Sequence, residues 1–193
     1  MGRLKGKTVA IIAANEFEDI ELLYPLLRLS EEGAKIIIIP VKGGLHPRPV
    51  AEKPVSGRYG TPIPLQVMKE GKRYVCLDLE KVDVKEIDCL LIPGGFSPDA
   101  LRINEEVLNL VRKMNELNKI IAAICHGPQV LISAGLAKGK KMTSYAAVRD
   151  DLINAGAEFV DESAVRDGNI ITARVPDDLP DFCQEIIKAL SET

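Results

Sequence analysis

A cysteine at the end of an apolar run is the residue with the clearest chemical potential in this sequence. Residues 120–124 are all apolar, Cys125 and His126 follow, and residues 129–134 suit a helix. This order predicts a buried strand that turns sharply into a helix, with Cys125 at the apex. Such a nucleophile elbow needs small residues two positions before and two after its apex, where Ala123 and Gly127 stand. Because a helix N-terminus stabilises negative charge, the pattern favours a reactive thiolate over the alternative, a buried structural cysteine.

A thiolate nucleophile also needs an oxyanion site and a group that moves protons. The backbone N–H groups of His126, at the elbow, and Gly95, at the end of another apolar run, are candidates for the oxyanion site. Glu18 follows the first apolar run, and we expect its carboxyl to reach the thiol. Residues 15–18 also fit a capping box with Asn15 as N-cap and Glu18 at N3, so a purely structural role for Glu18 stays open.

The elements that must position these residues alternate between strands and helices. Apolar runs predict strands over residues 8–13, 34–41, 88–93 and 120–124, and helical patterns cover residues 16–32, 105–118, 148–155 and 177–190. A hairpin is expected around Asp167-Gly168. This order predicts an α/β fold with a doubly wound, mostly parallel sheet and helices on both faces. Ligands of such sheets bind beyond the carboxyl ends of the strands, where Glu18, Gly95 and Cys125 all fall.

The chain of 193 residues is expected to form a single domain, 1–193. The alternation of strands and helices is interrupted at about residues 42–75 by an excursion that is rich in glycine, proline and charged residues. We expect this excursion to carry short strands of its own, including one over residues 73–79. A long insertion of this kind is usually functional or an interaction surface.

Composition excludes several classes of function. A net charge of −3 gives no electrostatic case for nucleic acid, and no apolar run approaches the length that spans a membrane, so a cytoplasmic protein is expected. The four cysteines form no CxxC pair, which indicates free thiols in a reducing compartment. With only two histidines, His46 and His126, a metal site is not expected.

Four motifs in this order resemble the DJ-1/PfpI superfamily, and the resemblance covers essentially the whole chain. They are the segments NEFEDIEL at residues 15–22, IPGG at 92–95, AICHGPQ at 123–129 and TSY at 143–145. The resemblance implies a flavodoxin-like fold and is closest to the PfpI-type intracellular proteases. The long excursion is more similar to members with glyoxalase-type activity.

The resemblance also implies roles for individual residues. Cys125 would be the reactive thiol, with Glu18 hydrogen-bonded to it and the N–H groups of Gly95 and His126 forming the oxyanion site. Tyr145 matches a tyrosine that lines the pocket. In PfpI-like members an acid from a neighbouring subunit completes a triad with the histidine. Asp99 stands at that position here, where the protease-like pattern has the longer glutamate.

Three functions remain open on these grounds. The first is a cofactor-free enzyme of the glyoxalase III or deglycase type, which converts a small carbonyl substrate such as methylglyoxal to lactate through Cys125 and Glu18. The second is an intracellular cysteine peptidase that uses Cys125, His126 and Asp99 from a neighbouring subunit in a homo-oligomer, a dimer or a trimer of dimers. The third is a redox-sensing or chaperone-like stress protein that acts through oxidation of Cys125.

Overall fold

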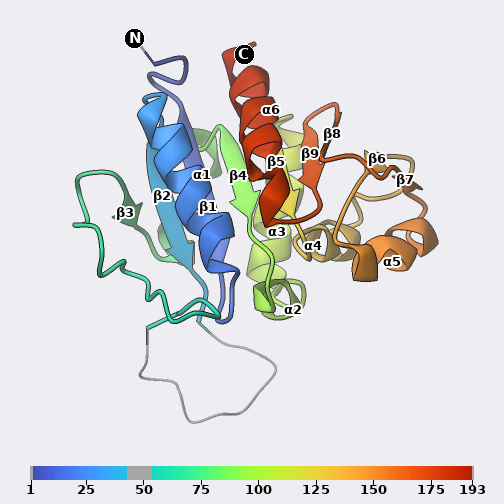
Figure 1. The fold of residues 1–193 in the computed structure, drawn as a ribbon, viewed down its shortest axis with the longest axis horizontal. Coiled ribbons are helices and arrows are strands. Elements are labelled where there is room, and N and C mark those ends of the chain that lie inside the picture. The colour runs from blue at the N-terminus through green and yellow to red at the C-terminus, as the bar shows by residue number, and fades with distance from the viewer. Residues whose placement is uncertain (1, 43–53, 193) are drawn as a thin grey trace.

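The computed structural model describes residues 2–42 and 54–192, and within them it contains one large and one small sheet (Figure 1). The large sheet consists of β1 (Thr8–Ala13), β2 (Lys35–Pro40), β3 (Val75–Cys76), β4 (Cys89–Ile92), β5 (Ile120–Ile124), β8 (Ala164–Asp167) and β9 (Ile170–Ala173). The small one pairs β6 (Lys141–Met142) with β7 (Glu158–Phe159). The helices are α1 (Asp19–Glu31), α2 (Ser97–Leu101), α3 (Glu105–Glu116), α4 (Pro128–Ser133), α5 (Arg149–Asn154) and α6 (Leu179–Ser191).

The large sheet has the order β3-β2-β1-β4-β5-β9-β8. Its strands are parallel except β8, which forms an antiparallel hairpin with β9 around the Asp167-Gly168 turn. The predicted doubly wound, flavodoxin-like sheet is therefore confirmed. Strand β1 lies near its centre, between β2 and β4, and the chain reaches every further parallel neighbour by a crossover.

Helices cover both faces of the sheet, which explains why its central strands are apolar on both sides. In β1, Val9 and Ile11 pack in the cluster that holds the apolar side chains of α1 and α6. The alternate residues Ala10 and Ile12 pack with those of α3 and α4. Figure 1 shows α1 and α6 side by side on one face of the sheet. Because helices pack on both faces of these strands, the positions of the strand ends are fixed, and so are the starts of the loops that follow them.

The excursion departs from its predicted form in one respect. The strand expected over residues 73–79 is only the two-residue β3, and it extends the large sheet by pairing parallel to β2 rather than forming a separate unit. Residues 43–53 of the excursion lie outside the described residues. The part from residue 54 onward returns to the carboxyl end of β1.

The carboxyl ends of β1, β4 and β5 lie next to one another, because these strands are sheet neighbours and parallel. The loops that leave them carry residues 14–18, the glycine pair at 94–95 and Cys125. None of the helices in the described ranges has the length and apolar character needed to cross a membrane.

Candidate active site

Cys125 is the turn residue between β5 and α4, and its φ of 62° lies in the left-handed region that side chains seldom adopt. Its N–H donates to the carbonyl of Ala173, and its own carbonyl accepts from the N–H of Tyr145, both at 3.0 Å. Gly127 packs so tightly that a Cβ added there would lie 2.6 Å from the carbonyl oxygen of Ile92. The predicted elbow, with its requirement for a small residue at position 127, is confirmed.

The carboxyl group beside this thiol belongs to Glu21. Its side chain is completely buried, and its Oε2 accepts a hydrogen bond of 2.6 Å from the N–H of Gly94. Gly94 lies between the two groups: a Cβ added there would be 2.6 Å from the Cβ of Cys125 and 2.9 Å from Oε2 of Glu21. The other oxygen, Oε1, is buried without a hydrogen-bond partner in residues 2–42 and 54–192. One oxygen is thus anchored, and the other is available to exchange a proton.

The expectation that Glu18 contacts the thiol is wrong. The Glu18 carboxylate instead forms an ion pair of 3.3 Å with Arg58, a residue of the excursion. Helix α1 begins at Asp19, so Glu18 occupies the N-cap position and makes no side-chain capping bond. Glu21, three residues later, is the acid that turns inward from the first turn of the helix.

The capping box over residues 15–18 is also absent. The side chain of Asn15 accepts a hydrogen bond of 3.0 Å from the N–H of Ser56, a partner 41 residues away. Phe17 forms isolated bridges with Gly57 and Gly95, and Glu16 before it has a left-handed φ of 62°, so the chain is not helical here. These long-range contacts delay the helix by about one turn, and this delay replaces Glu18 with Glu21 at the thiol.

The charge state of the pair follows from its surroundings. Burial, together with the charge of Glu21, raises the pKa of the Cys125 thiol to about 12, although the N–H groups of Gly95 and His126 favour the thiolate. The expectation of a lowered thiol pKa is therefore wrong for the resting site. Burial also raises the pKa of Glu21 to about 7, against the hydrogen bond from Gly94. Two neighbouring acids of this kind hold at most one negative charge, so the thiol is best ionised when Glu21 takes its proton.

His126 and Tyr145 lie at the same turn. The Nδ1 atom of His126 is 3.3 Å from the sulfur of Cys125, so the two adjacent side chains converge. The ring of Tyr145 lies against that of His126, with centroids 5.0 Å apart and planes tilted by 32°. Burial lowers the pKa of His126, and the charge of Asp99 acts in the opposite direction. Asp99 of the same subunit therefore acts on His126 through its charge, and no hydrogen bond between the two occurs in the described part of the chain.

Arg58 forms a rim over this site that the sequence did not reveal. Its backbone N–H donates to the carbonyl of Phe17, and its guanidinium lies 5.1 Å from the ring centre of Phe96, directly after Gly95. Asp19 secures the same segment by accepting hydrogen bonds from the N–H groups of Tyr59 at 2.9 Å and Thr61 at 3.0 Å. The excursion thus closes one side of the site.

Histidine, cysteine and carboxylate side chains do not gather in threes suited to a metal ion within residues 2–42 and 54–192. The site is instead a thiol, a buried carboxyl and an imidazole, bordered by backbone N–H groups from two turns.

A model of the DJ-1/PfpI family matches residues 7–189 of the sequence. The chain belongs to the DJ-1/PfpI family. Among relatives, it is 41% identical to "Deglycase PH1704" of Pyrococcus horikoshii over 94% of this chain and 98% of that one. It is 38% identical to a Bacillus subtilis protein named "Putative cysteine protease YraA", over 96% of this chain and 99% of that one. Its fold matches the crystal structure of Drosophila melanogaster DJ-1beta with a TM-score of 0.80 and 28% identity, covering 100% of this chain and 92% of that one.

Proposed function

We propose that this DJ-1/PfpI protein is a cofactor-free enzyme that uses Cys125 and Glu21 to convert reactive 2-oxoaldehydes to 2-hydroxy acids. Methylglyoxal, which would give lactate, is the simplest such substrate. The observation that carries the proposal is the buried carboxyl of Glu21, whose pKa is raised to about 7, next to the thiol at the elbow. Family members named deglycases support the same class of carbonyl substrate.

The first half of the reaction forms a covalent bond to sulfur. The carboxylate of Glu21 takes the proton of the Cys125 thiol, and the sulfur adds to the aldehyde carbon. The negative charge that develops on the aldehyde oxygen lies near the N–H groups of Gly95 and His126. Glu21 then returns the proton to this oxygen, which gives a neutral hemithioacetal.

The second half moves a proton between two carbons. Glu21 removes the proton from the former aldehyde carbon, and the hydroxyl proton on that carbon passes to the neighbouring ketone oxygen, which gives an enediol intermediate. Glu21 then returns its proton to the former ketone carbon, and the product is a thioester of the 2-hydroxy acid. Water attacks the thioester as Glu21 takes a proton from it, and Cys125 leaves as a thiolate to which Glu21 passes that proton. One carbon is oxidised as its neighbour is reduced, so no external oxidant is needed.

Purified protein should convert methylglyoxal to lactate without glutathione, with lactate measured by proton NMR. Cys125→Ala should abolish turnover, and Glu21→Gln should lower kcat by at least about 100-fold, the usual contribution of a general acid–base. Glu18→Gln removes an acid of the same charge at the rim and is expected to retain turnover within about threefold, as for a surface ion pair. Loss of activity in Glu18→Gln with full activity in Glu21→Gln would contradict the assignment.

A peptidase is the second candidate, supported by the 3.3 Å approach of His126 to the sulfur and by the name of the Bacillus subtilis relative. In this reaction Cys125 would attack an amide, and His126 would protonate the leaving amine. His126 would then need an orienting hydrogen bond, which we infer comes from Asp99 of a neighbouring subunit in a homo-oligomer. His126→Ala should lower the hydrolysis of a fluorogenic peptide far more than the turnover of methylglyoxal if both reactions occur.

A further inference from the structure

A groove of about 670 Å³ opens beside the elbow, at the residues that follow β6. It begins at Tyr145, whose ring contacts His126 and whose N–H is bonded to the carbonyl of Cys125. Ser144, which is almost completely buried, also lines it. Neither Cys125 nor His126 lines the groove, and Tyr145 is the residue that connects it to the elbow.

The groove contains two arginines in different electrostatic states. Arg174 is fully engaged: its Nε and Nη2 donate to Asp178 at 2.9 and 3.1 Å, and its Nη1 donates to Asp161 at 2.8 Å. Arg149 lies over the ring of Phe159, 5.7 Å from its centre, and makes no ion pair with an acid of the described residues. Arg149 thus presents a stacked cation that no ion pair within the described residues holds in place.

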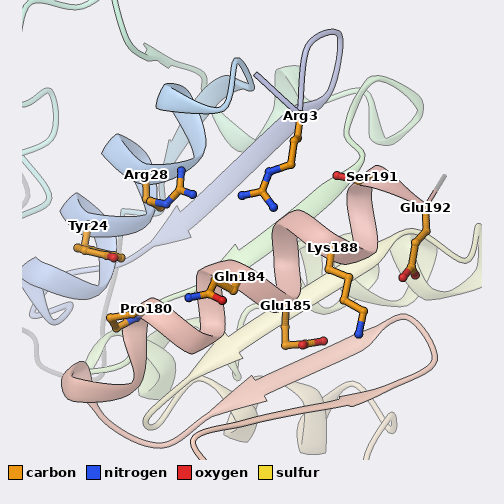
Figure 2. A pocket seen from close by; sticks show the side chains of 9 residues that line it. All are labelled: Arg3, Tyr24, Arg28, Pro180, Gln184, Glu185, Lys188, Ser191 and Glu192. Atoms are coloured by element: carbon orange, nitrogen blue, oxygen red, sulfur yellow. The ribbon is translucent and has the colours of Figure 1, made fainter. Parts of the chain in front are cut away.

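A second groove, of about 500 Å³, lies between α1 and α6, and both of its arginines are ion-paired (Figure 2). Its arginines, Arg3 and Arg28, both pair with Glu32 at 2.7 Å, so an incoming anion would compete with an acid already in place. The elbow residues take no part in lining it. The groove at Tyr145 is the better place for an anionic part of a substrate.

We propose that Arg149 binds a carboxylate on the carbonyl substrate, several atoms from the aldehyde that reacts with Cys125. This inference rests on the proposed function and narrows its substrate class to 2-oxoaldehydes and adducts that carry a carboxylate. A planar guanidinium pairs with a carboxylate through two parallel hydrogen bonds. A monoanion suits the groove better than a phosphate dianion, because the two acids around Arg174 leave one net negative charge nearby.

The full-length protein should be assayed with 4,5-dioxopentanoate, a 2-oxoaldehyde with a terminal carboxylate, and with its uncharged methyl ester. Wild-type protein should prefer the acid in kcat/KM by about tenfold or more, mainly through KM, as a charge-assisted hydrogen bond predicts. Arg149→Gln should reduce this preference to about one, whereas the control Arg112→Gln, on α3, should retain it. Equal kcat/KM for the two compounds in the wild type, or an unchanged preference in Arg149→Gln, would overturn the proposal.

If neither compound is turned over, the proposed function fails, and a binding measurement decides the subsite separately. Alkylation of Cys125 by iodoacetamide is followed by peptide mass mapping in the presence of glutarate or its uncharged diamide. Glutarate should slow the alkylation of wild type and of Arg112→Gln, but not that of Arg149→Gln. Equal protection by the diamide, or none by glutarate, would refute the carboxylate subsite.

Discussion

Above about pH 7, Cys125 and Glu21 hold one proton between them, and the charge of Glu21 disfavours the thiolate of Cys125. The burial that keeps Glu21 protonated up to about pH 7 also disfavours the isolated thiolate. An acid whose pKa lies near neutrality is suited to both accepting and returning a proton, as the proposed reaction requires. The raised pKa of Glu21 also makes the stability of the fold depend on pH.

The pKa of Glu21 predicts how stability depends on pH. Because burial raises this pKa from 4.5 to about 7, the folded state binds the proton more tightly than the unfolded state. The stabilisation is complete below pH 4.5 and is lost as the pH rises to about 7. Glu21→Gln, which stays neutral, should avoid the loss and gain up to about 3 kcal/mol relative to wild type across this window.

Urea unfolding of wild type and Glu21→Gln at several pH values between 4 and 8 measures this difference. Glu18→Gln controls for removal of one negative charge from the same end of α1. A constant free-energy difference between wild type and Glu21→Gln over this range would show that Glu21 does not titrate as the structure requires.

At the scale of elements, the site depends on close approach between the turns after β4 and β5. Gly94 and Gly127 have no side chains at places where a Cβ would meet neighbouring atoms at 2.6 Å. The contact partner of Gly127 is the backbone carbonyl of Ile92, which cannot rotate away as a side chain would. The elbow is therefore a property of two strands rather than of the 119–128 segment alone.

Gly127→Ala should destabilise the protein by about 1–3 kcal/mol, the usual effect of overpacking, and should lower turnover by displacing Cys125. The backbone at Gly127 is helical, with φ of −49°, so the cost arises from crowding rather than from an unusual conformation. Gly6→Ala provides the contrast, since its φ is 88° but its Cβ would meet nothing within 4 Å. Thermal unfolding and methylglyoxal assays should show turnover lost in the first variant and kept in the second.

Asp19 gives the rim segment its position. The residue is 7% exposed, and its carboxylate accepts hydrogen bonds from the N–H groups of Tyr59 and Thr61, so it joins α1 to the excursion. Asp19→Ala should cost about 2–3 kcal/mol, because it removes hydrogen bonds to a charged acceptor. Amide hydrogen exchange measured by mass spectrometry should speed up at residues 57–61. Asp181→Ala, in the first turn of α6, removes a comparable helix-end charge and should leave this segment protected.

For the whole molecule, the sequence predicted correctly those elements whose structure depends on the local pattern of apolar residues. The run of apolar residues after Thr8 predicted β1 at its observed bounds, and alternating strands and helices predicted a parallel sheet. The elbow was predictable because its requirements fall within a few residues of Cys125. Strands β4 and β5 are parallel neighbours, so Gly95 lies at the same edge of the sheet as Cys125, as expected for the ligand-binding edge of an open α/β sheet.

The errors concern residues whose surroundings come from distant segments. The start of α1 is set by bridges from Phe17 to Gly57 and Gly95, so a local capping pattern pointed to the wrong acid. A carboxyl at Glu21 was visible in the sequence, but its burial depends on Gly94, which is 73 residues away. Arg58 reaches the site only through the path of the excursion, for which the sequence offers no periodic signal.

Assembly of subunits provides a further prediction for the peptidase candidate. Asp99 of the same subunit acts on His126 through charge alone, so an orienting hydrogen bond would come from a neighbour. Cys125→Ala and Asp99→Asn subunits should each be inactive toward peptides. Their co-expressed mixture should recover about a quarter of the wild-type activity if random pairing forms dimers with one complete site in half of them. No recovery in isolated mixed oligomers would exclude a contribution of Asp99 across the interface.

The left-handed backbone of Cys125 has a consequence for how this chain would change over generations. Folding alone would favour glycine at this turn, since a side chain there costs about 1–2 kcal/mol. A gene copy that is no longer selected for its chemistry would therefore gain stability if glycine replaced this cysteine. We therefore expect descendants that keep the chemistry to keep cysteine at position 125, and descendants that keep only the scaffold to carry glycine there.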